Sequence, residues 1–153
     1  MKPISLIAGA LLAIGAIRGC SSTHQVKPGN PAATAESVSL VGTQWVLRDL
    51  AGSPALEKPQ ATLGFSGAGH AAGNGSCNQF NGSVSISGVS IKFGPLAATR
   101  MACMENGIGD QEDRYLKALG AATRYELHGE KLLIYFEGSD KPLAFSRAAG
   151  GNS

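Results

Sequence analysis

Residues 73–82, with the sequence GNGSCNQFNG, combine a cysteine with a run of glycine and asparagine. Such residues could hold a phosphate, present a thiol nucleophile, bind a metal or form a turn. A phosphate loop leads into a helix and usually carries a lysine, whereas this segment runs into SVSIS, a predicted strand. A thiol nucleophile needs a base within hydrogen-bond reach, and nothing in the sequence places His70 or another histidine beside Cys77. The segment therefore favours a turn between strands.

The first twenty residues predict export. One lysine precedes an apolar run over residues 4–17, which is shorter than the roughly 20 residues of a membrane-spanning helix and is typical of a secretory signal. The sequence IRGCSS that follows resembles a bacterial lipobox, in which the cysteine is acylated and becomes the mature N-terminus. Gly19 and Cys20 match that pattern, and Ser21 is similar to the residue that sorts lipoproteins to the outer membrane. We predict a lipoprotein-type signal peptide over residues 1–19 and lipidation of Cys20; the alternatives are an ordinary signal-peptidase site or a free Cys20.

The number and spacing of the three cysteines argue against a zinc site and favour a disulfide. A structural zinc site needs four closely paired Cys or His ligands, and the remainder of the chain offers Cys77 and Cys103 without a CxxC motif. If Cys20 carries lipid, these two lie in an exported domain, where a disulfide can form. It would close a loop of about 27 residues and stabilise the domain by about 3–4 kcal/mol in the loop-entropy model. We favour this disulfide over the alternative of two buried, reduced thiols.

Length and composition indicate one small domain on a tether. Residues 20–37 hold prolines and small residues with few apolar side chains, which predicts a flexible tether. The folded domain is expected over residues 38–148. The 21 glycines of the 153-residue chain favour turns over long helices. A net charge of +2 without a Lys/Arg-rich run gives no indication of nucleic-acid binding.

Short apolar runs separated by turn residues predict a mostly β (α+β) fold. We expect an antiparallel, barrel-like sheet with one packed α-helix, because a closed sheet has no exposed edge. The helix is predicted over residues 108–119, where apolar residues recur at helical spacing, and its apolar stripe is expected to face the core. The predicted strands are QWVLRDL at 44–50, ATLGFS at 61–66, a hairpin of SVSIS and VSIKF around Gly88, and a three-stranded meander over residues 124–147.

Polar residues in and after residues 73–82 have structural and binding interpretations. Asn78 suits stabilisation of its own turn. The guanidinium of Arg100 could bind a ligand, but we favour a structural role in which it satisfies carbonyls or a carboxylate. The acidic residues at the helix start are expected to be mostly solvated and to favour the positive end of the helix; they are Glu105, Asp110, Glu112 and Asp113. No pair of carboxylates is placed for acid–base catalysis.

The segments GNGSCNQFNGSV, ISGVSIKFGPLAATRMACM, RYLKAL and TRYELHGEKLLIYF, in this order, resemble the META domain of the HslJ heat-shock protein family. The resemblance covers about residues 40–147, and its most specific parts are CNQFNG and ATRMAC. It implies a small bacterial envelope domain that is mostly β with one helix. It brings no catalytic residue to this chain. The residues on the family pattern, with possible binding roles, are Asn78, Phe80, Gly82, Thr99 and Arg100, together with Cys103.

We therefore expect a non-enzymatic, lipid-anchored outer-membrane protein facing the periplasm. The resemblance implies a role in cell-envelope, heat or novobiocin stress. The alternative is a periplasmic β-barrel that binds a small ligand or inhibits an enzyme, and an enzyme using Cys77 ranks last. We expect a monomer without cofactor, metal or nucleic acid, held at the membrane by its lipid and able to meet an unidentified envelope protein.

Overall fold

The computed structural model describes residues 39–104 and 106–149. The predicted signal peptide, the lipidation site Cys20 and the predicted tether lie outside the described residues. Within the described residues, no helix combines the length and the apolar character that crossing a bilayer requires.

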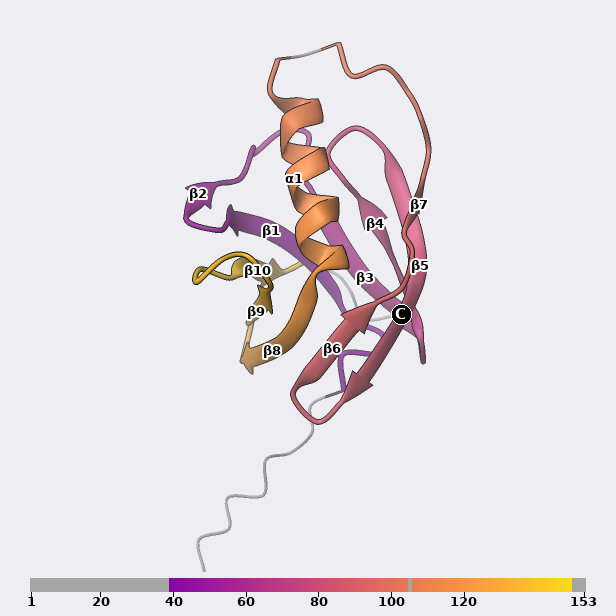
Figure 1. The fold of residues 1–153 in the computed structure, drawn as a ribbon, viewed down its shortest axis with the longest axis vertical. Coiled ribbons are helices and arrows are strands. Elements are labelled where there is room, and N and C mark those ends of the chain that lie inside the picture. The colour runs from indigo at the N-terminus through magenta and orange to yellow at the C-terminus, as the bar shows by residue number, and fades with distance from the viewer. Residues whose placement is uncertain (1–38, 105, 150–153) are drawn as a thin grey trace, which may run out of the picture. The chain divides into compact units, whose positions relative to one another are not determined.

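Eight antiparallel strands form a closed barrel in the described part of the chain (Figure 1). Neighbouring strands follow the order β1–β3–β4–β5–β6–β8–β9–β10, and β10 pairs with β1, with Trp45 opposite Arg147. Each strand of the barrel therefore has a partner on both sides. The eight strands are β1 (Gln44–Leu50), β3 (Thr62–Gly67), β4 (His70–Asn74), β5 (Gln79–Ser87), β6 (Ser90–Phe93), β8 (Ala122–His128), β9 (Lys131–Phe136) and β10 (Leu143–Arg147). The two-residue strands β2 (Ser53–Pro54) and β7 (Ala97–Ala98) pair with β1 and β5.

The helix α1 (Ile108–Gly120) lies beside the strands of the barrel (Figure 1). Its apolar stripe packs against the barrel core, to which Tyr115 and Leu119 belong. Tyr115 is fully buried, and its ring lies 5.8 Å from that of Phe80 in β5 and 6.2 Å from that of Phe145 in β10. The Tyr115 hydroxyl donates a hydrogen bond of 3.1 Å to the carbonyl oxygen of Thr62. Burial raises the pKa of this phenol well above its ordinary value. One helical side chain thus contacts strands from both halves of the chain.

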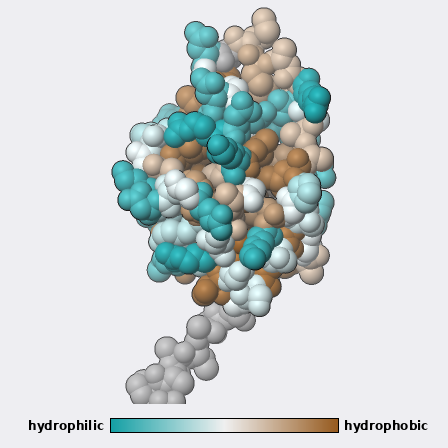
Figure 2. Space-filling view, viewed as in Figure 1, coloured by the Kyte–Doolittle hydropathy of each residue, from teal (hydrophilic) through white to brown (hydrophobic). Residues whose placement is uncertain are grey.

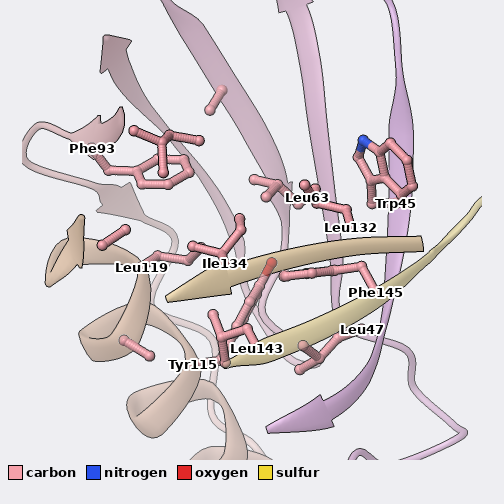
Figure 3. Close-up of a cluster of buried hydrophobic side chains, with 14 of the residues drawn as sticks. Trp45, Leu47, Leu63, Phe93, Tyr115, Leu119, Leu132, Ile134, Leu143 and Phe145 are labelled. Carbon is pink, nitrogen blue, oxygen red and sulfur yellow. The ribbon is translucent and has the colours of Figure 1, made fainter. Parts of the chain in front are cut away.

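Large side chains fill the interior of the barrel (Figure 3). They come from alternate positions of the strands, as Leu63 and Phe65 do in β3, because successive strand residues point to opposite faces. The largest fully buried side chains are Trp45, Leu47, Leu63, Phe65, Phe80, Ile91, Tyr115, Leu119, Leu132, Ile134, Leu143 and Phe145. A ligand held inside the barrel would have to displace this core.

The predicted fold class is confirmed: an antiparallel barrel with one packed helix. The helix starts at the predicted Ile108 and ends one residue later than expected, at Gly120. The hairpin around Gly88 and the C-terminal meander are present as β5–β6 and β8–β10. The strand β4 was not predicted, because its sequence HAAGN has none of the β-branched or aromatic residues that mark strands. Its pairing with β3 and β5 forms it nonetheless.

Candidate functional site

Residues 73–82 contain the end of β4, a tight turn and the start of β5. The turn is closed by a hydrogen bond of 2.7 Å from the Gly75 amide to the Asn78 carbonyl oxygen. The side-chain oxygen of Asn74 accepts a hydrogen bond of 2.7 Å from the amide of Ser76. Ser76 has a φ of 105°, which is rare for a residue other than glycine. The predicted turn between strands is therefore present.

The turn holds a carboxylate of the protein itself, that of Glu112 in α1. One oxygen of Glu112 accepts hydrogen bonds from the backbone amides of Cys77, at 3.1 Å, and Asn78, at 2.6 Å. The other oxygen accepts a hydrogen bond of 2.7 Å from the Asn78 side-chain amide. Glu112 is 7% exposed, so these three donors replace most of its hydration. The sequence argued against a phosphate at this turn; the anion that the turn holds is an internal side chain.

Gly75 makes room for that carboxylate. A Cβ atom at this position would lie 2.6 Å from a carboxylate oxygen of Glu112 and 2.7 Å from its Cγ atom, closer than real side chains approach. The missing side chain therefore allows the turn and the helix to approach each other. A second polar contact supports the same approach: the Gln111 amide donates to the Ser76 hydroxyl at 2.6 Å and accepts from the Leu56 amide at 2.7 Å.

Asn78 also holds the segment that precedes the helix. Its side-chain oxygen accepts hydrogen bonds from the Thr99 hydroxyl, at 2.8 Å, and from the Met101 amide, at 2.7 Å. Asn78 is 5% exposed. A single buried side chain thus joins the turn, the helix and the segment before the helix. Among the described residues, no buried side-chain nitrogen or oxygen lacks a hydrogen-bond partner.

A disulfide joins Cys77 and Cys103, with their Cα atoms 5.9 Å apart. The disulfide favoured from the sequence is therefore present. It fixes residues 97–104 at Cys103, and β7 and Asn78 hold the first part of the same segment. We call residues 97–104 the Met segment, because it carries Met101 and Met104, which are 61% and 90% exposed.

The structure does not bring the other residues of the family pattern together at one site. Phe80 is a core residue in edge-to-face contact with Tyr115. Gly82 lies under residues 95–96, and a Cβ atom there would meet the Pro95 carbonyl oxygen at 2.9 Å. Arg100 is exposed in the Met segment. Among the described residues it forms no ion pair or side-chain hydrogen bond, so its favoured structural role has no described partner.

The arrangement offers little for covalent catalysis at Cys77. Its sulfur is bonded to Cys103 and carries no free thiol. His70 begins β4, whereas the turn follows the other end of that strand. Among the described residues, no group of three or more His, Cys, Asp or Glu side chains is placed to hold a metal ion. The contacts described at the site are the hydrogen bonds of Glu112 and Asn78 and the disulfide of Cys77.

The expectation that Glu112 is mostly solvated is wrong. Ile108, Glu112 and Tyr115 recur at the helical spacing i, i+4, i+7, so Glu112 lies on the buried stripe of α1. A carboxylate at helical spacing from Ile108 and Tyr115 is the signal that could have identified it. The partner amides could not be identified in this way, since they belong to a turn distant in sequence.

Comparisons with known proteins agree with this architecture. A model of the META domain matches residues 38–150. A solution structure of a protein from Burkholderia xenovorans has a TM-score of 0.58 and 29% identity, covering 87% of this chain and 99% of that one. A second solution structure has a TM-score of 0.58 at 22% identity, covering 70% and 90% of the two chains. No match was found among curated proteins.

A more distant structure extends the fold comparison. The crystal structure of a DUF4847 family protein from Bacteroides vulgatus has a TM-score of 0.52 at 15% identity, covering 70% of this chain and 93% of that one. Below 25% identity such likeness concerns the fold alone. None of these matches indicates an enzyme family. The family match, over most of the chain and including the turn, the disulfide and the helix, shows that this protein belongs to the META domain family.

Proposed function

We propose that the protein is a non-enzymatic binding protein of the bacterial cell envelope that contacts an envelope protein through the Met segment. The observation that carries this proposal is the exposure of Met101, which lies between the contacts to Asn78 and the disulfide at Cys103, and of Met104, which directly follows that disulfide. In Figure 2, apolar residues gather at the top of the view, where Figure 1 places the loop between β7 and α1.

A fixed, exposed apolar segment suits protein binding for two reasons. Binding would cost little conformational entropy, because Asn78 and the disulfide already hold much of the segment's backbone in place. The methionine side chains remain adaptable and can fit an irregular apolar surface. Single exposed apolar residues are common on proteins, but two that lie close together on one short segment favour an interaction site.

The lipid anchor and the stress role complete the proposal. The signal and lipobox pattern ending at Cys20 supports anchoring at the outer membrane on a tether. Resemblance to the HslJ family supports a role under heat or novobiocin stress. Mass spectrometry of the mature N-terminus tests the anchor: an acylated Cys20 is expected, and an unmodified chain that keeps Met1 would contradict it.

A complementation experiment tests the role of the Met segment. A strain lacking the protein is expected to grow poorly under heat or novobiocin and to recover with the wild-type gene. The double variant Met101→Ser, Met104→Ser should fold normally and fail to restore growth. The matched control Ile86→Ser, Val89→Ser removes two other exposed apolar residues, at the β5–β6 turn, and should restore growth. Equal growth with both double variants would contradict the binding role, and normal growth of the deletion strain would contradict the stress role.

A further inference from the structure

A hollow of about 540 Å³ lies on the outer face of β1, β3, β4 and the start of β5. Strand register explains its floor. Gly64 stands between Gln44 of β1 and Ala72 of β4, and Ala72 in turn pairs with Asn81 of β5. One row of residues therefore crosses four strands: the amide side chain of Gln44, Gly64 without a side chain, the methyl group of Ala72 and the amide side chain of Asn81. Of this row, Gln44, Gly64 and Ala72 line the hollow. Gly64 and Ala72, which have the two smallest side chains, form its floor, and the amide of Gln44 stands at one end.

A second row of polar side chains lies beside the first. Asn74 pairs with Gln79 across β4 and β5, and the Asn74 backbone amide donates to the Thr62 hydroxyl at 3.0 Å. Ser66 lies two residues after Gly64 in β3, on the same face of the strand, and adds another hydroxyl to the lining. The hollow is thus surrounded by amide and hydroxyl groups.

Several of these polar groups are available to a ligand. Among the described residues, the side-chain amides of Gln44 and Gln79 and the hydroxyl of Ser66 have no protein hydrogen-bond partner. Asn74 uses its side-chain oxygen to accept from Ser76, which leaves its amide hydrogens for a ligand. None of the residues that line the hollow carries a charged side chain.

We propose that this hollow binds an N-acetylated sugar of an uncharged glycan. Its volume falls within the roughly 300–1,000 Å³ range of small-molecule sites. A charged ligand would find no counter-charge in the lining, and a purely apolar ligand would leave amides without partners. A sugar presents hydroxyls that both donate and accept, and its acetamido group matches the side-chain amides of Gln44, Asn74 and Gln79.

The affinity of the hollow for a single sugar unit should be low. Phe65 is the one aromatic residue in the lining, and at 1% exposure its ring faces the core and cannot stack on a sugar. Recognition therefore rests on hydrogen bonds in an open hollow, where water competes. We expect a dissociation constant on the order of 1 mM per short chain. A glycan polymer would be retained longer, because released sugars rebind at neighbouring units.

Titration with chitotetraose, followed by the NMR signals of side-chain amides, tests the site on the folded protein. The amide signals of Gln44, Asn74 and Gln79 should shift together, and those of Gln111 should not. Cellotetraose, which lacks acetamido groups, should bind at least about fivefold more weakly, since it loses the amide contacts. Shifts that are absent at 10-fold excess over the expected ~1 mM constant would overturn the proposal.

A variant that fills the floor provides the sharper test. A Cβ atom at Gly64 would lie 3.5 Å from its nearest neighbour, an ordinary contact, so Gly64→Val should fold and occupy the hollow. The control Gly67→Val changes the same strand outside the lining, where a Cβ atom meets nothing within 4 Å. Chitotetraose binding should weaken at least about tenfold in Gly64→Val and in Gln79→Ala, and remain unchanged in Gly67→Val. Equal binding by all three variants, or stronger shifts with an uncharged peptide, would overturn the glycan assignment.

The hollow and the proposed partner contact use different side chains, although the backbone of Gln79 is hydrogen-bonded to Thr99 of the Met segment. The lining of the hollow includes none of residues 97–104. The Met101→Ser, Met104→Ser variant should therefore bind chitotetraose like the wild type, and Gly64→Val should still restore growth if the stress role depends on the Met segment alone. Failure of one proposal is thus distinguishable from failure of the other.

Discussion

The carboxylate of Glu112 accepts hydrogen bonds from both the backbone amide and the side-chain amide of Asn78. The side-chain oxygen of Asn78 points the other way and accepts from Thr99 and Met101. Rotation of the Asn78 amide group by half a turn would place its donor against two donors and its acceptor against the carboxylate. The pair therefore has one satisfied arrangement, and this arrangement fixes the helix relative to the turn.

The Glu112–Asn78 pair should show strong coupling in a double-mutant cycle. Glu112→Gln leaves one acceptor oxygen for three donors, and Asn78→Asp places two carboxylates in one buried site. Each single change should lower the free energy of unfolding by about 2–4 kcal/mol. Together they restore one carboxylate and one amide with their places exchanged, so about 1–3 kcal/mol should be recovered. Urea denaturation of the four proteins measures this.

The control for this cycle is Asn81→Asp, combined with the same change at Glu112. Asn81 is exposed in β5 and does not contact α1 through a hydrogen bond. Its effect should add to that of Glu112→Gln without coupling. Additive effects at Asn78 as well would show that the exchange of hydrogen bonds is not what stabilises the pair.

Alanine substitutions at two glycines should have opposite consequences. Gly75→Ala forces a methyl group against the Glu112 carboxylate and should lower the free energy of unfolding by about 1–3 kcal/mol. Gly64→Ala adds a methyl group at ordinary contact distance in a strand, and should be neutral or stabilising by a few tenths of a kcal/mol. Thermal denaturation of both variants decides this. A similar loss at both positions would show that chain flexibility matters more than the space at Gly75.

The disulfide should protect the Met segment from proteolysis. The native protein should show no thiol at Cys77 or Cys103 before reduction. The double variant Cys77→Ala, Cys103→Ala should lose about 3–4 kcal/mol of stability in the loop-entropy model. Trypsin should then cut after Arg100 faster than after Arg124, because Arg100 lies in the Met segment and Arg124 in a barrel strand. Equal cleavage at both sites would indicate global unfolding instead.

Tyr115 should make the protein sensitive to alkaline pH. Its pKa is raised in the folded protein, so folding favours the neutral phenol. The unfolded chain releases this proton near pH 10, which stabilises the unfolded state. The contribution of Tyr115 is therefore complete below about pH 10 and is lost as pH rises toward the raised pKa. Tyr115→Phe should be less stable at pH 7 and lose less stability between pH 9 and 11. Parallel stability curves for the two proteins would contradict this.

The sequence predicted individual helices and strands better than the contacts between elements that are distant in the chain. The spacing of two in the hairpin around Gly88, the turn residues between the strands of the C-terminal meander and the periodicity of α1 are local features, so they are visible along the chain. The strand β4 is held by neighbours instead of by its own residues, and it was missed for that reason. The burial of Glu112 depends on a turn far away in the sequence. The hollow depends on the register of four strands, which no single segment reveals.

The pairing of β1 with β10 places Trp45 opposite Arg147, and the Arg147 guanidinium lies 4.9 Å from the Trp45 ring. Because the first strand of the barrel pairs with its last, the barrel cannot close until Leu143–Arg147 has emerged from whatever machinery synthesises or secretes the chain. A chain that is exported from its N-terminus would thus remain open during its passage. A domain of this topology would reach its closed form only once its final strand is available, because the closing contact joins residues far apart in the sequence.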